Sequence, residues 1–109
     1  MKLILAIVQR EDAIILTDAL MEAEFYVTKL SSTGGFLKMN NTTLMIGTDD
    51  CNVEKALEII KNTSKSREQF VASPMPVGSM DLGLSTMPIK VRVGGATVFI
   101  LDVDRFEKY

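Results

Sequence analysis

The distribution of apolar residues in the first half of the chain predicts four secondary-structure elements. Residues 2–9 contain a continuous apolar run, which is typical of a strand buried on both faces. Asp12, a suitable helix N-cap, precedes apolar side chains at helical spacing, namely Ile15, Leu16, Ala19, Leu20 and Ala23. Residues 25–32, rich in β-branched and aromatic types, and residues 43–48 predict two further strands.

A second helix is expected after residue 50. Val53, Leu57 and Ile60 fall on one helical stripe, so one side of this helix faces a core. Asp49 and Asp50 stand directly before the stripe, and we expect them to cap the N-terminus of the helix.

The C-terminal part of the chain predicts more strands. Residues 69–72 suggest a minor strand, while residues 89–93 and 96–101 flank Gly94 and Gly95 as in a β-hairpin with a two-residue turn. The resulting order is β-α-β-β-α-β with an added C-terminal strand. This order is typical of an α+β fold of the ferredoxin-like class.

The apolar pattern also predicts self-association. Two helices cover only one face of such a sheet, yet residues 3–8 and 98–101 are apolar throughout. An apolar face left in water is an association surface, and cyclic symmetry is the usual arrangement of identical chains. We therefore expect a homo-oligomer.

Length and charge limit the remaining possibilities. The 109 residues fit a single domain spanning 1–109, and the net charge of −2 argues against a surface for polymeric nucleic acid. The apolar run at the start is too short to span a bilayer and no signal-peptide cleavage site follows it, so no membrane insertion is expected. The lone Cys51 fits a reducing compartment, and we expect a cytoplasmic protein.

The residue types present argue against catalysis and against a metal site. Histidine, the commonest general base and transition-metal ligand, is absent from the chain. No paired-carboxylate arrangement or activated nucleophile stands out. We therefore predict no enzyme, no catalytic residue, no metal and no cofactor.

Two loops are longer than the fold requires. The short loop, residues 33–43, reads TGGFLKMNNTT, and the long loop, residues 74–87, contains Met75, Met80 and Met87 without any lysine or arginine. Long loops in compact domains are usually functional or disordered, and methionines suit an adaptable partner surface. The long loop is thus interpreted either as a contact for an unknown protein partner or as a loosely packed insertion.

The short loop carries groups suited to a small ligand. Gly34 and Gly35 allow close backbone approach, Phe36 can stack on a flat base, and Asn41 offers both a donor and an acceptor to an adenine edge. Thr28, on the preceding strand, lies near enough in sequence to line the same pocket. Each residue also has a purely structural explanation as a turn former or a core side chain, so both interpretations stay open at this point.

Several motifs together resemble one known family. These are MKLILAIVQ at the start, VTKLSSTGGFLK with NTT after it, Gly47, the Arg67-Glu68-Gln69 segment, and VGGATVFILDVDRF. In this order they resemble the PII-like cyclic-di-AMP receptors, the PstA or DarA family, over essentially the whole chain.

The resemblance implies a function and a set of site residues. It implies a bacterial, non-enzymatic signalling protein, a ferredoxin-like homotrimer that binds cyclic di-AMP between subunits and relays the signal by loop rearrangement. The short loop would correspond to the T-loop of PII proteins and the long loop to the B-loop. The ligand-binding positions that match are Thr28, Gly35, Phe36, Leu37, Asn41, Gly47 and Phe99, with Tyr26 and Lys108 as additional contacts.

The chain departs from the family pattern at two positions near these residues and at its C-terminus. Glu24 and Tyr26 stand where other members carry asparagine and arginine, so a charged donor is lost. Glu107-Lys108-Tyr109 stands where a His-Gln-Phe ending is common, and we expect Lys108 of a neighbouring subunit to restore the positive charge. The alternatives are therefore a trimeric interaction protein with weakened or lost cyclic-di-AMP binding, or a sensor of another adenine nucleotide. A classical ATP-binding PII protein and a CutA-type metal protein are less compatible with the loop composition and the absence of histidine.

Overall fold

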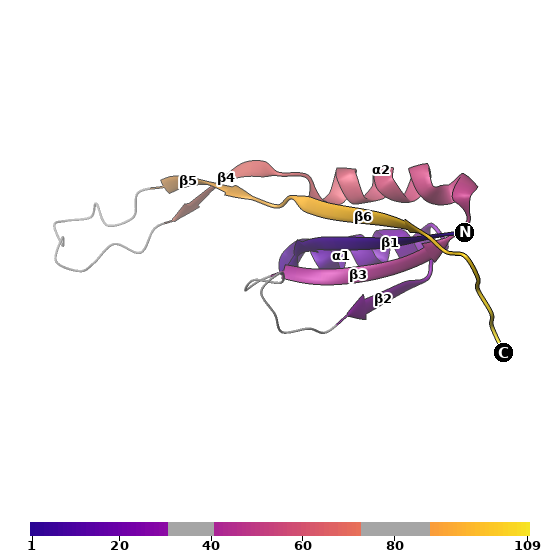
Figure 1. The fold of residues 1–109 in the computed structure, drawn as a ribbon. Coiled ribbons are helices and arrows are strands. Elements are labelled where there is room, and N and C mark those ends of the chain that lie inside the picture. The colour runs from indigo at the N-terminus through magenta and orange to yellow at the C-terminus, as the bar shows by residue number, and fades with distance from the viewer. Residues whose placement is uncertain (31–40, 73–87) are drawn as a thin grey trace, which may run out of the picture.

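The computed structural model describes residues 1–30, 41–72 and 88–109. The order of the elements along the chain is β1 (Lys2–Gln9), α1 (Arg10–Glu22), β2 (Val27–Leu30), β3 (Asn41–Thr48), the 3₁₀ turn η1 (Asp50–Asn52), α2 (Val53–Ser64), β4 (Arg67–Ala72), β5 (Pro88–Val93) and β6 (Ala96–Asp102). Figure 1 shows the two helices on one side of the main sheet. The predicted ferredoxin-like order of an α+β fold is confirmed.

Four strands form the main sheet in the order β2-β3-β1-β6, with every neighbour antiparallel. β1 occupies a central place, because β3 and β6 pair with its two edges. In the register, Leu5 lies opposite Met45 on β3 and opposite Phe99 on β6. At the end of β1, Gln9 lies opposite Asn41, the first residue of β3.

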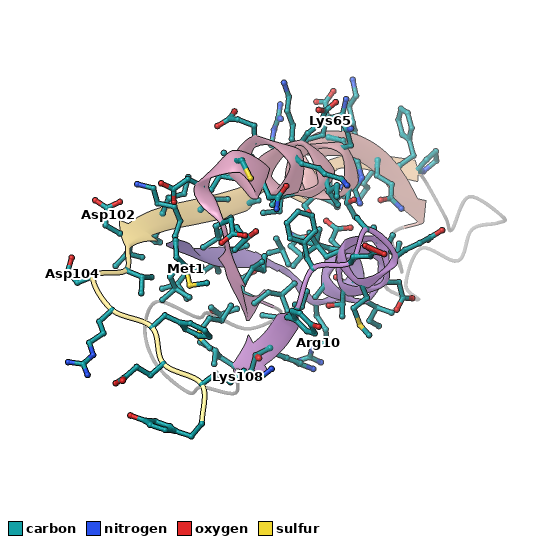
Figure 2. All side chains as sticks on the ribbon, turned by 90° about the vertical axis from the view of Figure 1, so that its right-hand side faces the viewer. Met1, Arg10, Lys65, Asp102, Asp104 and Lys108 are labelled. Carbon is teal, nitrogen blue, oxygen red and sulfur yellow. The ribbon has the colours of Figure 1, made fainter. Side chains whose placement is uncertain are left out.

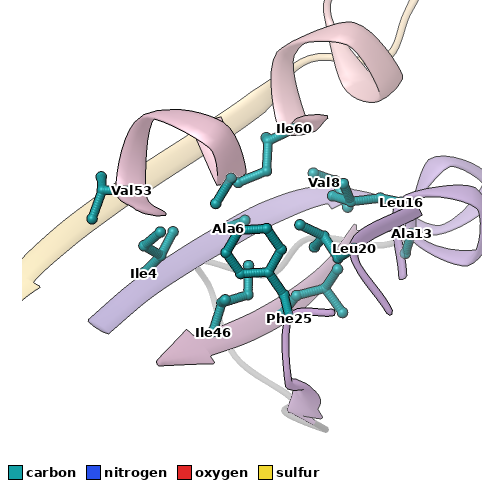
Figure 3. Packing of buried hydrophobic residues seen from close by; sticks show 12 residues of the cluster. Ile4, Ala6, Val8, Ala13, Leu16, Leu20, Phe25, Ile46, Val53 and Ile60 are labelled. Atoms are coloured by element: carbon teal, nitrogen blue, oxygen red, sulfur yellow. The ribbon is translucent and has the colours of Figure 1, made fainter. Parts of the chain in front are cut away.

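The core lies between the helices and one face of this sheet. Alternate residues of β1 enter it, since Ile4, Ala6 and Val8 are almost fully buried. Figure 3 shows Phe25, Leu16 and Leu20 meeting these side chains from the α1 side, with Ile60 reaching them from α2. At roughly 1.5–3 kcal/mol for each large buried aliphatic side chain, this cluster is the main source of stability.

The start of α1 differs from the prediction. The helix begins at Arg10 with Gln9 as its N-cap, so Asp12 lies in the first turn and does not cap it. This phase buries Ala13, Leu16 and Leu20, whereas Ile15, predicted to face the core, is 61% exposed. The shift arises because β1 runs directly into α1 and leaves no separate loop.

The predicted capping of the second helix is also wrong in detail. η1 precedes α2. Asp49 is the N-cap residue of η1 and Asn52 that of α2, and neither makes a side-chain capping hydrogen bond. Asp50 instead forms an ion pair with the N-terminal ammonium of Met1, at 2.9 Å. The stripe itself is confirmed, with Val53 and Ile60 buried and Leu57 packed at the core margin.

The predicted hairpin between residues 89–93 and 96–101 is wrong. β5 pairs with β4 in a separate two-stranded ribbon, while β6 pairs with β1 in the main sheet. Gly94 and Gly95 both have positive φ and turn the chain from the ribbon into the sheet. We call β4 and β5 together the arm, which extends away from the main sheet in Figure 1.

Candidate functional site

A cleft of about 760 Å³ opens at one end of the main sheet. Its walls come from five places: the start of β1, the connection between α1 and β2 together with the start of β2, the end of β3, the segment that leads into α2, and the C-terminal tail. Figure 2 shows this tail leaving Asp102, passing Asp104 and reaching Lys108. The cleft therefore combines segments that are far apart in the sequence.

The first wall is set by the way α1 ends. The amides of Glu24 and Phe25 donate to the carbonyls of Met21 and Leu20, both at 2.9 Å, and Glu24 takes φ 69°. These two hydrogen bonds, together with one residue in the left-handed conformation, form a Schellman motif at the end of the helix. Glycine or asparagine is usual at the left-handed position. Phe25 is then largely buried, and Glu24 and Tyr26 line the cleft together with it.

The second wall is formed by the end of β3 and the segment after it. Gly47 leaves room at the sheet surface, because a Cβ added there would meet no atom within 4 Å. The hydroxyl-bearing Thr48 and then Asp49, Asn52 and Lys55 continue the wall into α2. This wall therefore combines an open backbone position with several hydrogen-bonding side chains.

Charges of both signs face the cleft. Glu24 and Asp49 supply carboxylates, and Lys55 and Lys108 supply ammonium groups. Next to the wall, the N-terminal ammonium hydrogen-bonds to Asp50 and lowers the pKa of that carboxyl. Such a cleft suits a ligand that presents anionic groups in one place and hydrogen-bond donors in another.

The structure brings together four of the residues proposed from the sequence. Thr28 and Gly47, together with Tyr26 and Lys108, line the cleft. Gly35, Phe36 and Leu37 lie outside the described residues, and so does the whole long loop at 74–87. Asn41 and Phe99 do not line the cleft.

Thr28 and Phe99 occupy the two ends of one row across the sheet. Thr28 lies opposite Met45, Met45 opposite Leu5, and Leu5 opposite Phe99, one residue from each of the four strands. Three steps between neighbouring strands separate Thr28 and Phe99 by about 14 Å. The two residues therefore cannot contact the same chemical group of a ligand from within one chain.

Asn41 is separated from the cleft along the strand. It shares the sheet face of Gly47 but stands six residues before it, a distance of about 20 Å in an extended strand. The two residues therefore belong to opposite ends of β3.

The face of the sheet away from the helices is apolar. Leu3, Leu5 and Ile7 of β1 are only half-buried there, and Phe99 and Leu101 of β6 are each 45% exposed. We call this the open face. Its composition agrees with the predicted need for burial of both strand faces.

Sequence reasoning missed several residues of the cleft. Asp49 was interpreted only as a helix cap, and Asn52, Lys55 and Phe106 were not considered, yet all four line the cleft. Asp49 and Asn52 follow Gly47 within five residues, so their proximity to a predicted site residue was the available signal. No local pattern places the tail residue Phe106 at the cleft.

The described part of the chain shows neither a cluster of metal ligands nor a membrane-spanning helix. Among residues 1–30, 41–72 and 88–109, no three histidine, cysteine, aspartate or glutamate side chains are grouped so that they could hold a metal ion. Neither α1 nor α2 has the length and apolar character needed to cross a bilayer.

Comparison with known proteins identifies a family and a solved relative. The family described as cyclic-di-AMP receptor matches residues 1–109, the whole chain. The fold is also similar to the crystal structure of a functionally unknown protein from Pediococcus pentosaceus ATCC 25745, with a TM-score of 0.77. The two chains are 48% identical, and the match covers 99% of this chain and 96% of the other.

Proposed function

Since the chain belongs to the cyclic-di-AMP receptor family, we propose that it acts as a cytoplasmic homotrimer that binds cyclic di-AMP between its subunits. Receptor membership implies binding rather than catalysis. In this proposal the bound nucleotide changes the arrangement of the two long loops, and the loop at 74–87 passes the signal to a protein partner.

The row from Thr28 to Phe99 carries the proposal. These two family contact positions lie at opposite edges of one sheet, about 14 Å apart, with only Met45 and Leu5 between them. Cyclic packing of copies on their open faces would bring β6 of one chain toward the cleft of the next. A site shared in this way explains why the family positions divide into two groups in a single chain.

The chemistry of the cleft supports a nucleotide with two phosphates. Lys55 and Lys108 offer charged donors to phosphate oxygens, and Phe106 offers a ring against which a base can stack. Thr28 and Thr48 add hydroxyl groups. In this role Lys108 compensates for Tyr26, which stands where other family members carry an arginine.

Calorimetric titration of the purified oligomer with cyclic di-AMP tests the proposal directly. We expect saturable binding of one nucleotide per subunit, and no heat from ATP or cyclic di-GMP at the same concentrations. Light scattering on the same sample should give the mass of three chains. Absence of binding by a folded trimer would contradict the receptor function.

Replacement of Lys108 tests the cation of the tail. Lys108→Met should weaken cyclic-di-AMP binding about tenfold to a hundredfold, because a charge-assisted hydrogen bond contributes about 1.5–3 kcal/mol. The matched control is Lys61→Met, which removes an exposed lysine from the last turn of α2, away from the cleft. Equal affinities of the two variants would exclude Lys108 from the site.

One observation favours the alternative of weakened binding. The carboxylates of Glu24 and Asp49 line the same cleft as the lysines, and they repel an anionic ligand. Under this alternative the trimer forms and meets its protein partner, but cyclic di-AMP binds poorly or another adenine nucleotide is preferred. The same titration distinguishes the two, since ATP and cyclic di-AMP are compared on one protein.

A further inference from the structure

Four segments of the chain meet where the arm joins the main sheet. The Gly94 amide donates a hydrogen bond to the side-chain oxygen of Gln9, at 2.9 Å. Beside it, the Arg67 guanidinium binds the Asp12 carboxylate with both terminal nitrogens, at 2.8 and 3.3 Å. One of these nitrogens also donates to the Lys65 carbonyl, at 3.1 Å. The start of β4, the end of β5, the end of β1 and the first turn of α1 are thereby joined.

The Asp12–Arg67 pair is a strongly oriented contact. The Asp12 side chain is only 4% exposed, whereas the Arg67 side chain remains 42% exposed. The hydrogen bonds that the Arg67 guanidinium donates to the Asp12 carboxylate raise the pKa of Arg67. Bidentate pairing of a guanidinium with a carboxylate fixes the direction of the arginine as well as its distance.

Only glycine can be accommodated without strain at position 94 beside the Asp12–Arg67 pair. Gly94 has φ 81°, and a Cβ at this position would overlap the Arg67 guanidinium and approach the Lys65 carbonyl to 2.7 Å. The neighbouring Gly95 amide donates to the carbonyl of Ser64, the last residue of α2. The joint is therefore closely packed at Gly94, against Arg67 and the Lys65 carbonyl.

Gln9 also belongs to the edge where β3 begins. It lies opposite Asn41 in the register of β1 and β3, and Asn41 is one of the residues that the resemblance implies as ligand contacts. One residue thus contacts the base of the arm through its side chain and the start of β3 through its backbone.

We propose that Gln9, Asp12 and Arg67 form a latch that couples the arm to the start of β3, so that the two loosen or tighten together. An isolated two-stranded ribbon is marginally stable, so the arm depends on such contacts for its direction. The signalling consequence rests on the proposed function: a ligand that engages Asn41 changes the order of the arm through Gln9.

Hydrogen exchange on the ligand-free oligomer tests the latch itself. Gln9→Met keeps the side-chain length but removes the acceptor for the Gly94 amide, and Gln9→Glu retains an acceptor as the matched control. We expect Gln9→Met to speed exchange at least tenfold in two places, the arm amides of residues 67–72 and 89–93 and the β3 amides of residues 41–43. Amides 47 and 48, at the far end of β3, serve as the internal reference and should not change.

The pattern of exchange decides the proposal. Faster exchange in both places, with Gln9→Glu close to the wild type, supports coupling. Faster exchange in the arm alone would reduce the latch to a local support and overturn the coupling, and unchanged exchange in both would overturn the latch. The double variant Asp12→Asn with Arg67→Met provides a second opening of the latch without leaving a buried charge unpaired, and it should reproduce the result for Gln9→Met.

A titration with cyclic di-AMP separates the latch from the proposed function. In the wild type, bound cyclic di-AMP should slow exchange of the arm amides. Gln9→Met should bind within about threefold of the wild-type affinity but show no slowing in the arm, and slowing equal to that of the wild type would overturn the coupling. If the wild type does not bind cyclic di-AMP, the proposed function fails, while the ligand-free comparison still decides the latch.

Discussion

Glu24 is the described residue whose identity conflicts most clearly with its backbone. Its φ of 69° lies in the left-handed region, where a side chain with a Cβ costs roughly 1–2 kcal/mol. The conformation is imposed from both sides, since the Schellman bonds end α1 and the buried Phe25 starts the next segment. A strained residue at a cleft suggests that its carboxylate has a use there.

Substitution of Glu24 separates strain from charge. Glu24→Gly should raise the free energy of unfolding by about 1 kcal/mol, because glycine adopts positive φ without a steric penalty. Glu24→Ala removes the same carboxylate but keeps a Cβ, so its stability should match that of the wild type. Chemical denaturation of the three proteins measures the difference, and equal gains in both variants would assign the effect to charge.

Residues with long-range partners limit what the sequence alone can predict. Asp12 was predicted to be a cap because aspartate before an apolar helical repeat is typical of one. Its partner Arg67 is 55 positions away, and no local pattern connects them. By contrast, Ile4, Leu16 and Ile60 were expected in the core, and their burial follows from periodicity alone.

At the scale of elements, the strands were easier to predict than their partners. Residues 89–93 and 96–101 have strand composition, and two glycines between them resemble a hairpin turn. In the structure β5 pairs with β4, whereas β6 pairs with β1 and completes the main sheet. The choice between the two pairings depends on tertiary burial, which local turn chemistry does not contain.

The junction between β5 and β6 gives a direct stability test. Gly94→Ala should lower the free energy of unfolding by at least about 2 kcal/mol, since it combines the cost of positive φ with overlap at Arg67. Gly47→Ala is the control on β3, where the added methyl group meets open space and stability should change by less than about 0.5 kcal/mol. Thermal melting in parallel compares the two.

The control variant Gly47→Ala is also expected to change ligand binding. A methyl group at Gly47 projects into the cleft, so Gly47→Ala should weaken cyclic-di-AMP binding although the fold is unchanged. Similar affinities of wild type and Gly47→Ala would place the nucleotide away from this part of β3.

At the scale of the whole molecule, the open face is the feature that the sequence predicted best. A strand buried on one face alternates apolar and polar residues, whereas β1 is apolar almost throughout. This difference predicted an apolar second face and, from it, self-association. The pattern does not predict how many copies associate or with what geometry, because periodicity describes a strand face and not the edges β2 and β6 of the sheet.

Placing a charge on the open face should prevent assembly. Leu5→Asp introduces a carboxylate at the centre of this face, and burying it unpaired between copies would cost at least several kcal/mol. Sedimentation should then show single chains. Ile15→Asp, at an exposed apolar position on the helical side, should leave the oligomer intact.

If dissociation occurs equally in both variants, or in neither, the open face is not the assembly surface. Circular dichroism of both variants should match the wild type, which would exclude misfolding as the reason for dissociation.

The separation of Thr28 from Phe99 along one row affects how much nucleotide is needed for a response. When a binding site is divided between copies, the nucleotide acts as a joint between them, and occupancy and assembly become linked by mass action. A dilute population of chains would then require more messenger for the same response, while abundant messenger would hold sparse chains together. On the proposed function, the threshold of the response is therefore set as much by how much protein the cell makes as by the affinity of any single cleft.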